Sequence, residues 1–205
     1  RKIHPYNVSL NVQQGDHFVK SFVTINYTVT MKKKNQVDIR AFAGGFANID
    51  NRADGGFFFS PCMANGSDDY MYDNVFIGRS ETDGFLSHQV AESEGNMKVY
   101  TPLGRSDTWI ASLNLKAPLP VKFPAGVFAD ITMLPSKVTL NETMLYDAGL
   151  YIPLLKNYVE IYIPLLMSQD IRDVFYHNNL DLVAPPNGDD PDKYRFKRMA
   201  RMIRF

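Results

Sequence analysis

Apolar and polar residues alternate with a period of two along most of the first two thirds of the chain, a pattern typical of β-strands with one buried face. The clearest run covers residues 17–31, where Val19, Val23, Ile25 and Tyr27 share one face while lysine, threonine and asparagine line the other. β-Branched side chains of this kind suit a pleated surface. We therefore predict a long, half-buried strand here.

The same alternation recurs in shorter segments that are separated by turn residues. A hairpin is expected between residues 17–31 and 37–42, with the odd-numbered apolar residues of the second strand directed inward. The pair Gly44–Gly45 then indicates the start of an irregular loop. The other strands predicted in this part of the chain cover residues 6–13, 72–78, 96–102, 107–118 and 126–134.

The most apolar stretch, Tyr151–Met167, contains the word YIPLL twice. A membrane-spanning helix needs about 20 uninterrupted apolar residues, whereas this stretch holds two prolines, which disrupt helix interiors. Its alternation instead predicts two strands that end at Pro153 and Pro164, since proline cannot donate to a ladder. The Leu-Leu pairs after the prolines have two interpretations: they plug the end of the fold, or they form an exposed apolar patch.

These elements together predict a mainly β protein, an antiparallel β-sandwich of jelly-roll or immunoglobulin-like topology. After the strands, residues 168–177 have the spacing of a short helix, with Ser168 as its N-cap. We expect one sandwich domain over residues 1–183, a linker over 184–192, and a basic amphipathic C-terminal arm over 193–205.

Composition and residue spacing narrow the kinds of functional site that we expect in this chain. The chain has one cysteine, which excludes an intrachain disulfide, and its formal net charge is zero, so no global field attracts nucleic acid or an anionic membrane. The four histidines show no metal-ligand spacing, and no glycine cluster matches a phosphate loop. We therefore expect no catalytic residue, no metal site and no cofactor, and classify the chain as a non-enzyme with no transmembrane segment.

Four Asn-x-Ser/Thr sequons are candidate glycosylation sites: Asn7, Asn26, Asn65 and Asn141. The first two fall on polar faces of predicted strands, where a glycan would point outward. The first residue is Arg1 rather than methionine, which fits removal of a leading segment or a trimmed sequence. The alternative is an asparagine-rich protein that never enters a secretory pathway.

The C-terminal arm carries the strongest charge asymmetry. Its basic residues are the candidate partner-binding set: Lys193, Arg195, Lys197, Arg198, Arg201 and Arg204. Because the whole chain sums to zero, the remaining residues carry a formal charge of six negative. The arm has four interpretations: it docks on an acidic face of a neighbouring copy, binds nucleic acid, lies on a membrane surface, or folds back on its own body.

Two functions from different classes fit these features. The first is a non-catalytic structural subunit of a larger assembly, such as the capsid protein of a virus or phage particle, whose arm contacts copies of itself or other subunits. The second is a secreted, glycosylated binding module for an apolar ligand or a carbohydrate. The corresponding locations are a virion and the extracellular space.

Overall fold

The structure is a computed structural model. It describes residues 4–16, 18–31, 35–48, 57–64, 71–72, 74–77, 89–92, 94–101, 103–121, 123–135, 144–155, 159–173 and 202–204. The candidate sequons Asn65 and Asn141, the predicted linker and most of the basic arm lie outside these residues.

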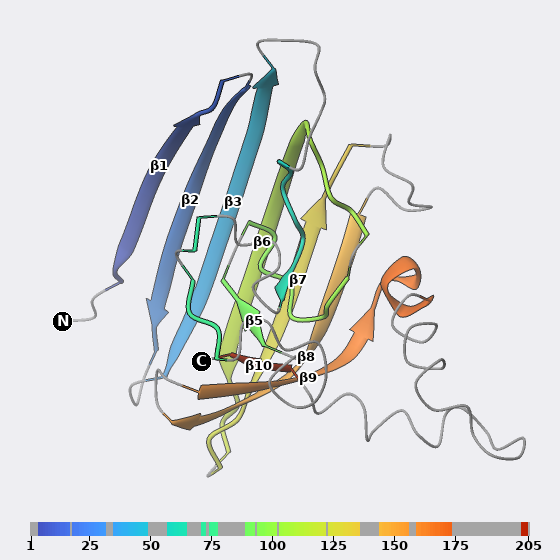
Figure 1. Ribbon diagram of the computed structural model, residues 1–205. Coiled ribbons are helices and arrows are strands. Elements are labelled where there is room, and N and C mark those ends of the chain that lie inside the picture. The colour runs from blue at the N-terminus through green and yellow to red at the C-terminus, as the bar shows by residue number, and fades with distance from the viewer. Residues whose placement is uncertain are drawn as a thin grey trace, which may run out of the picture.

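One antiparallel sheet dominates the described chain, and its strands stand in the order β1-β2-β3-β6-β7-β8-β9-β10 (Figure 1). The mainly β class is thus confirmed. The long connection from β3 to β6 contains the remaining two strands, which pair only with each other. The bounds are β1 Tyr6–Gln14, β2 Phe18–Thr30, β3 Gln36–Asn48, β4 Met63–Ala64, β5 Val90–Ala91, β6 Trp109–Pro118, β7 Gly126–Met133, β8 Met144–Leu155, β9 Val159–Met167 and β10 Met202–Arg204.

The alternating segments predicted around β1, β2, β6 and β7 are strands, and the β2–β3 hairpin is confirmed. Strand β3 runs through Gly44 and Gly45, so the predicted start of a loop there was wrong. A Cβ atom added at Gly44 would lie 2.7 Å from the ring of Phe59. The glycine therefore stays in the strand because it lets an aromatic side chain pack directly on the backbone.

Two predicted strands are wrong. Residues 96–102 and 72–78 contain no strand within their described parts. In the first, the backbone N–H groups of Lys98 and Val99 donate to the carboxylate of Asp147 rather than to a neighbouring strand. In the second, the backbone N–H of Ile77 donates to the side chain of Gln89, 2.8 Å away. Side chains here satisfy the backbone in place of a ladder.

The apolar stretch with the repeated word forms strands β8 and β9, as predicted. Neither strand ends at its proline, however. Both continue to the second leucine or beyond, and the pairing shifts register between Ala148 and Gly149 and again between Pro153 and Leu155. Pro153 stands beside one of these shifts, and the other shift lies next to Gly149, the partner of Pro164. Irregular pairing of this kind tolerates a residue that cannot donate.

The Leu-Leu pairs do not plug the fold in the described structure. Leu154 is 58% exposed and Leu166 is 65% exposed. The plug was therefore wrong for these two leucines, and the interpretation as an exposed apolar patch stays a prediction.

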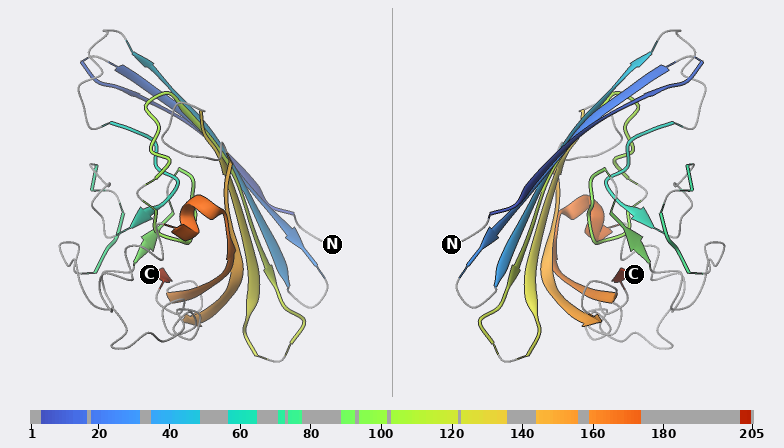
Figure 2. Two further views of the ribbon diagram at one scale, coloured as in Figure 1. Left: turned by 90° about the vertical axis from the view of Figure 1, so that its right-hand side faces the viewer. Right: turned by 90° about the vertical axis from the view of Figure 1, so that its left-hand side faces the viewer.

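The irregular segments and the short helix all cover the same face of the sheet, which we call the inner face (Figure 2). The core lies between them and includes Phe42, Ile110, Phe128 and Leu145 from the sheet. Phe59, Cys62, Met97, Val99 and Ile171 pack against these from the cover. Within the described residues, strand pairing in the cover is limited to β4 with β5 and an isolated bridge between Phe59 and Ser106, so the cover holds no second full sheet.

The helix begins where predicted and is described over residues 169–173. The backbone carbonyl of Ser168 accepts from Arg172 N at 3.0 Å, which is the first helical bond. The Ser168 hydroxyl makes no hydrogen bond within the described structure, so it does not complete the expected N-cap. At the C-terminus, β10 pairs with β9, and Arg204 stands opposite Glu160.

Candidate interaction surface and polar cavity

The opposite side of the large sheet, which we call the outer face, is apolar and uncovered by any described residue (Figure 2). This reverses the expected orientation, because the apolar residues of β2 and β3 were predicted to point inward. Leu10, Leu113 and Ile131 are 74%, 50% and 39% exposed. In contrast, Arg40 and Asp130 are 8% and 1% exposed on the inner face.

The strand register places outer-face residues in rows that cross β1, β2, β3, β6, β7 and β8. The central row is Val8, Ile25, Ala41, Leu113, Ile131 and Tyr146. The rows on either side are Leu10, Val23, Ala43, Ala111, Met133 and Met144, and Tyr6, Tyr27, Ile39, Leu115, Ala129 and Ala148. Not one of these positions carries a charged or amide side chain.

Outer-face side chains differ in size between the neighbouring strands β3 and β6. Along β3 the outer-face residues Ala41, Ala43 and Gly45 are small. Their register partners on β6 are Leu113, Ala111 and Trp109, so a large side chain stands opposite Ala41 and another opposite Gly45. Trp109 is the only tryptophan of the chain and is 42% exposed. Small residues of β3 therefore stand beside two large side chains of β6, with a pair of alanines between them.

The inner face carries charged residues that find partners in the cover. Lys20 Nζ lies 2.6 Å from Glu94 Oε1, and the two side chains are 4% and 14% exposed. The second oxygen of Glu94 accepts from Ser60 N at 2.7 Å. The ammonium of Lys20 also sits 4.7 Å from the ring centroid of Phe59. The cover therefore neutralises a strand lysine and packs an aromatic ring beside it.

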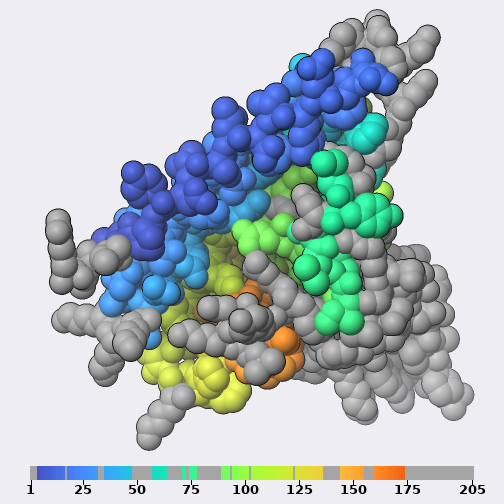
Figure 3. Space-filling view, turned by 60° about the vertical axis from the view of Figure 1, so that its left-hand side comes forward, coloured from blue at the N-terminus to red at the C-terminus, as the bar shows by residue number. Residues whose placement is uncertain are grey.

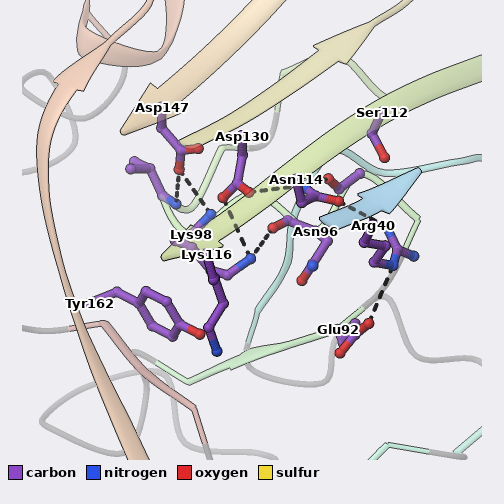
Figure 4. A network of polar contacts seen from close by, with 12 residues as sticks. Arg40, Glu92, Asn96, Lys98, Ser112, Asn114, Lys116, Asp130, Asp147 and Tyr162 are labelled. Atoms are coloured by element: carbon purple, nitrogen blue, oxygen red, sulfur yellow. Dashed lines mark hydrogen bonds and ion pairs between the residues drawn. The ribbon is translucent and has the colours of Figure 1, made fainter. Parts of the chain in front are cut away.

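A second set of polar contacts joins β3, β6 and β7 to the segment around residue 95 (Figure 4). Arg40 Nη1 donates to Asn114 Oδ1 at 3.1 Å and to the carbonyl of Glu94 at 3.0 Å. Asn114 Nδ2 donates to Asp130 Oδ1 and to the carbonyl of Gly95, both at 2.9 Å. These bonds satisfy buried groups that would otherwise cost stability.

Two carboxyl groups face one another at the end of this network. Asp130 and Asp147 are direct cross-strand partners on β7 and β8, and each is 1% exposed. Lys98 Nζ lies 3.5 Å from Asp130 Oδ2, and its side chain is 2% exposed. Asp147 Oδ2 accepts from the backbone N–H groups of Lys98 and Val99 at 2.8 and 2.9 Å. One buried ammonium thus stands beside two buried acids (Figure 4).

Burial raises the pKa of Asp147 well above its ordinary value, and the negative charge of Asp130 raises it further. Burial also raises the pKa of Asp130, against the opposing effect of Lys98. The folded chain therefore binds a proton on this pair more tightly than the unfolded chain does. The resulting contribution to stability is fully present below the unfolded carboxyl pKa of about 3.9 and is lost as the pH rises through the folded pKa.

A polar cavity of about 330 Å³ lies over this network, between the N-terminal strands and residues 92–98. Its charged lining residues are Arg40, Lys98, Lys116, Asp38, Glu92 and Asp130, three of each sign. The amides of Asn26, Asn96 and Asn114 complete most of the lining. Asn96 has a left-handed backbone with a φ of 54°, and its carbonyl accepts a hydrogen bond from the ammonium of Lys98.

Strand β1 forms one edge of the sheet, open along its length (Figure 3). It pairs with β2 in unbroken register over all nine residues. The strand contains no charge, proline or bulge, which are the features that usually protect an edge.

The sequence-predicted site residues do not gather in one place. Asn7 on β1 and Asn26 on β2 are exposed register partners. The remaining sequons and five of the six basic arm residues lie outside the described chain, and Arg204 lies in β10. The arm's last described residues, Met202–Arg204, pair as a strand with β9 of their own chain.

Residue pattern alone did not identify the buried network, although one signal was present. The inner-face positions of β2 and β3 mix charged residues with phenylalanine, as in Lys20 with Phe22 and Arg40 with Phe42. Aromatic residues on the supposedly solvated face indicate that this face is covered too.

Comparison of the chain with protein families, with curated proteins and with solved structures finds no match. Within the residues that the structure describes, no helix has the length and apolar character needed to cross a membrane.

Proposed function

We propose that this protein is a non-catalytic structural subunit of a larger assembly, of the kind found in virus or phage particles. The observation that carries the proposal is the outer face, an uncharged surface that spans six strands. Each strand occupies about 4.8 Å across the sheet, and each of the three rows occupies about 6.8 Å along it. The face therefore covers roughly 600 Å² in projection, the upper end of what monomeric proteins expose.

A surface of this size and composition needs a cover of matching chemistry. The area is near the ~800 Å² per partner that stable protein interfaces bury. A neighbouring subunit that covers it would supply the second layer of the predicted β-sandwich. In this proposal the large sheet is one half of a sandwich whose other half belongs to another subunit.

The basic arm contributes a second subunit contact in this proposal. Backbone pairing of β10 with β9 anchors the end of the chain to its own sheet. The anchored arm then presents its lysines and arginines to an acidic neighbour, with nucleic acid as the other candidate partner.

Light scattering combined with intact-mass analysis tests the proposed function. We expect an unglycosylated chain that forms oligomers or particles larger than a monomer. A monomer at every protein concentration, in the presence and absence of nucleic acid, would refute a structural role in an assembly.

One observation favours the alternative function, the secreted binding module. Nine of the twelve residues that line the cavity are charged or carry an amide, with three charges of each sign, which suits a neutral, hydroxyl-rich ligand such as a saccharide. Glycans on the chain together with saturable binding of a mono- or disaccharide, lost in Asn114→Leu, would favour this function over the first.

A further inference from the structure

We infer that the occupant of the outer face is a second copy of this chain, stacked face to face about a two-fold axis. The inference rests on the proposed function and adds the identity of the partner and the geometry of the contact. Three features of the face support it: its area, its lack of charge, and the position of small residues on β3 opposite Leu113 and Trp109 on β6.

The lack of charge limits the chemistry of the partner. Every position in the three rows is aliphatic, aromatic or methionine, so the occupant must present an equally apolar surface. A second copy offers one of the same size. Its sheet has the same right-handed twist, and two such sheets pack with their strands about 30° apart and about 10 Å between layers.

The small residues of β3 and the two large residues of β6 make the face complementary to itself. In an isologous dimer, a contact from one residue to a second is repeated from the second to the first. If the axis runs along the strands between β3 and β6, each β3 lies over the partner's β6. Ala41 of each chain then receives Leu113 of the other, and Gly45 receives Trp109, because these are the register pairs of β3 and β6.

Large side chains thus enter positions where the facing side chain is a methyl group or hydrogen. Tryptophan and tyrosine at the centre of an interface frequently dominate its binding energy. Trp109 lies on β6 at the centre of the sheet, and Tyr27 and Tyr146 lie on the outer face of β2 and β8. The result is a sandwich assembled from two chains, which accounts for the missing second sheet within the described part of each chain.

Single lysine substitutions test the interface without disturbing the core. Ala43 and Leu113 are exposed on the outer face, so Ala43→Lys and Leu113→Lys leave the isolated subunit folded. Leu10→Lys on β1 adds a more peripheral charge to the same face. Asn11→Lys is its matched control, since Asn11 is the next residue of the same strand, is exposed, and points to the other side.

Sedimentation equilibrium measures the dimer dissociation constant of each variant, with circular dichroism as the fold control. In a two-fold symmetric dimer, each substitution places two new charges in the interface, one from each chain. We therefore expect Ala43→Lys and Leu113→Lys to raise the dissociation constant at least about a hundred-fold. Asn11→Lys should leave it within about three-fold. If the folded Ala43→Lys and Leu113→Lys variants associate as tightly as the wild type, the inference is refuted.

Cross-linking tests the geometry independently of affinity. Cys62 is 1% exposed, so introduced thiols dominate reactivity. We expect a short bismaleimide to join an Ala41→Cys chain to a Leu113→Cys chain in a mixture, and not to join Ala41→Cys to Asn11→Cys. Absence of the first product would overturn the two-fold arrangement. If the wild type forms oligomers but this cross-linked product is absent, the proposed two-fold geometry is wrong while the structural role stands. If the wild type is always monomeric, both the geometry and the structural role are refuted.

Discussion

Truncation of matched side chains on the two faces of β6 should have very different costs. Ile110 points to the inner face and is 1% exposed, whereas Leu113, three residues along the same strand, points outward and is 50% exposed. Replacing either by alanine removes the same number of carbon atoms. Because the faces differ in burial, the two variants separate the observed orientation of the sheet from the one that hydropathy predicts.

The magnitudes follow from burial. Removing three buried carbons costs about 2.4 kcal/mol in transfer free energy, and the cavity left in a packed core raises the cost to about 2–5 kcal/mol for Ile110→Ala. At Leu113 only half of the side chain is buried within the subunit, so the transfer cost falls to about 1.2 kcal/mol. We expect Ile110→Ala to be the more destabilising variant by about 2 kcal/mol in dilute, monomeric protein.

Urea unfolding of each variant measures the cost of the substitution in the monomer at a low protein concentration and in the associated protein at a high one. In the concentrated sample, association adds a stability term that depends on Leu113 but not on Ile110, so the cost of Leu113→Ala should grow. A Leu113→Ala variant as destabilised as Ile110→Ala in the dilute sample would show that the outer face is covered within the subunit, and would refute the reasoning.

Three further predictions concern the inner face. Asp147→Asn removes the buried acid whose pKa is raised on folding. The unfolding free energy should therefore fall less steeply as the pH rises from about 4 towards neutrality. An unchanged slope of unfolding free energy against pH, measured by urea titration, would contradict this. Glu94→Ala removes the carboxylate that pairs with the buried Lys20 and should lower the free energy of unfolding by about 3–5 kcal/mol. The double variant Lys20→Met with Glu94→Leu should recover much of this loss. A double variant no more stable than the single one would contradict the ion-pair account. Gly149→Ala should cost about 1–3 kcal/mol, because the new Cβ would lie 2.1 Å from the carbonyl oxygen of Ile163; thermal unfolding at the wild-type temperature would disprove the close approach.

Alternation along the chain was sufficient to predict strands in the regions of β1 to β3 and β6 to β9, because period-two patterning reflects the pleat whichever face is buried. It predicted neither β10 nor the second half of β3. It did not decide which face is buried. The charged residues of the inner face find their partners far along the chain: Lys20 meets Glu94, and Asp147 meets the backbone of residues 98 and 99. No local pattern announces such pairings, so the polar face was interpreted as the solvated one.

The cover was the least predictable part. Met97 and Val99 alternate as strand residues do, and both are buried in the core. Their backbone is irregular because the Asp147 carboxylate, rather than a neighbouring strand, accepts the N–H groups of residues 98 and 99. Likewise, the prolines of β8 and β9 were expected to end their strands, but shifts of register let the strands continue. In both places tertiary contacts override a local rule.

The single tryptophan provides the most direct measurement of whether the outer face is covered in the working protein. Trp109 lies on that face and is 42% exposed in the isolated chain. Acrylamide quenching of its fluorescence should decrease, and its emission should shift to shorter wavelength, as protein concentration rises through the dissociation constant for association. Quenching that stays high and equal at all concentrations, including those at which the protein is oligomeric, would show that the apolar face remains open to solvent and would contradict the account.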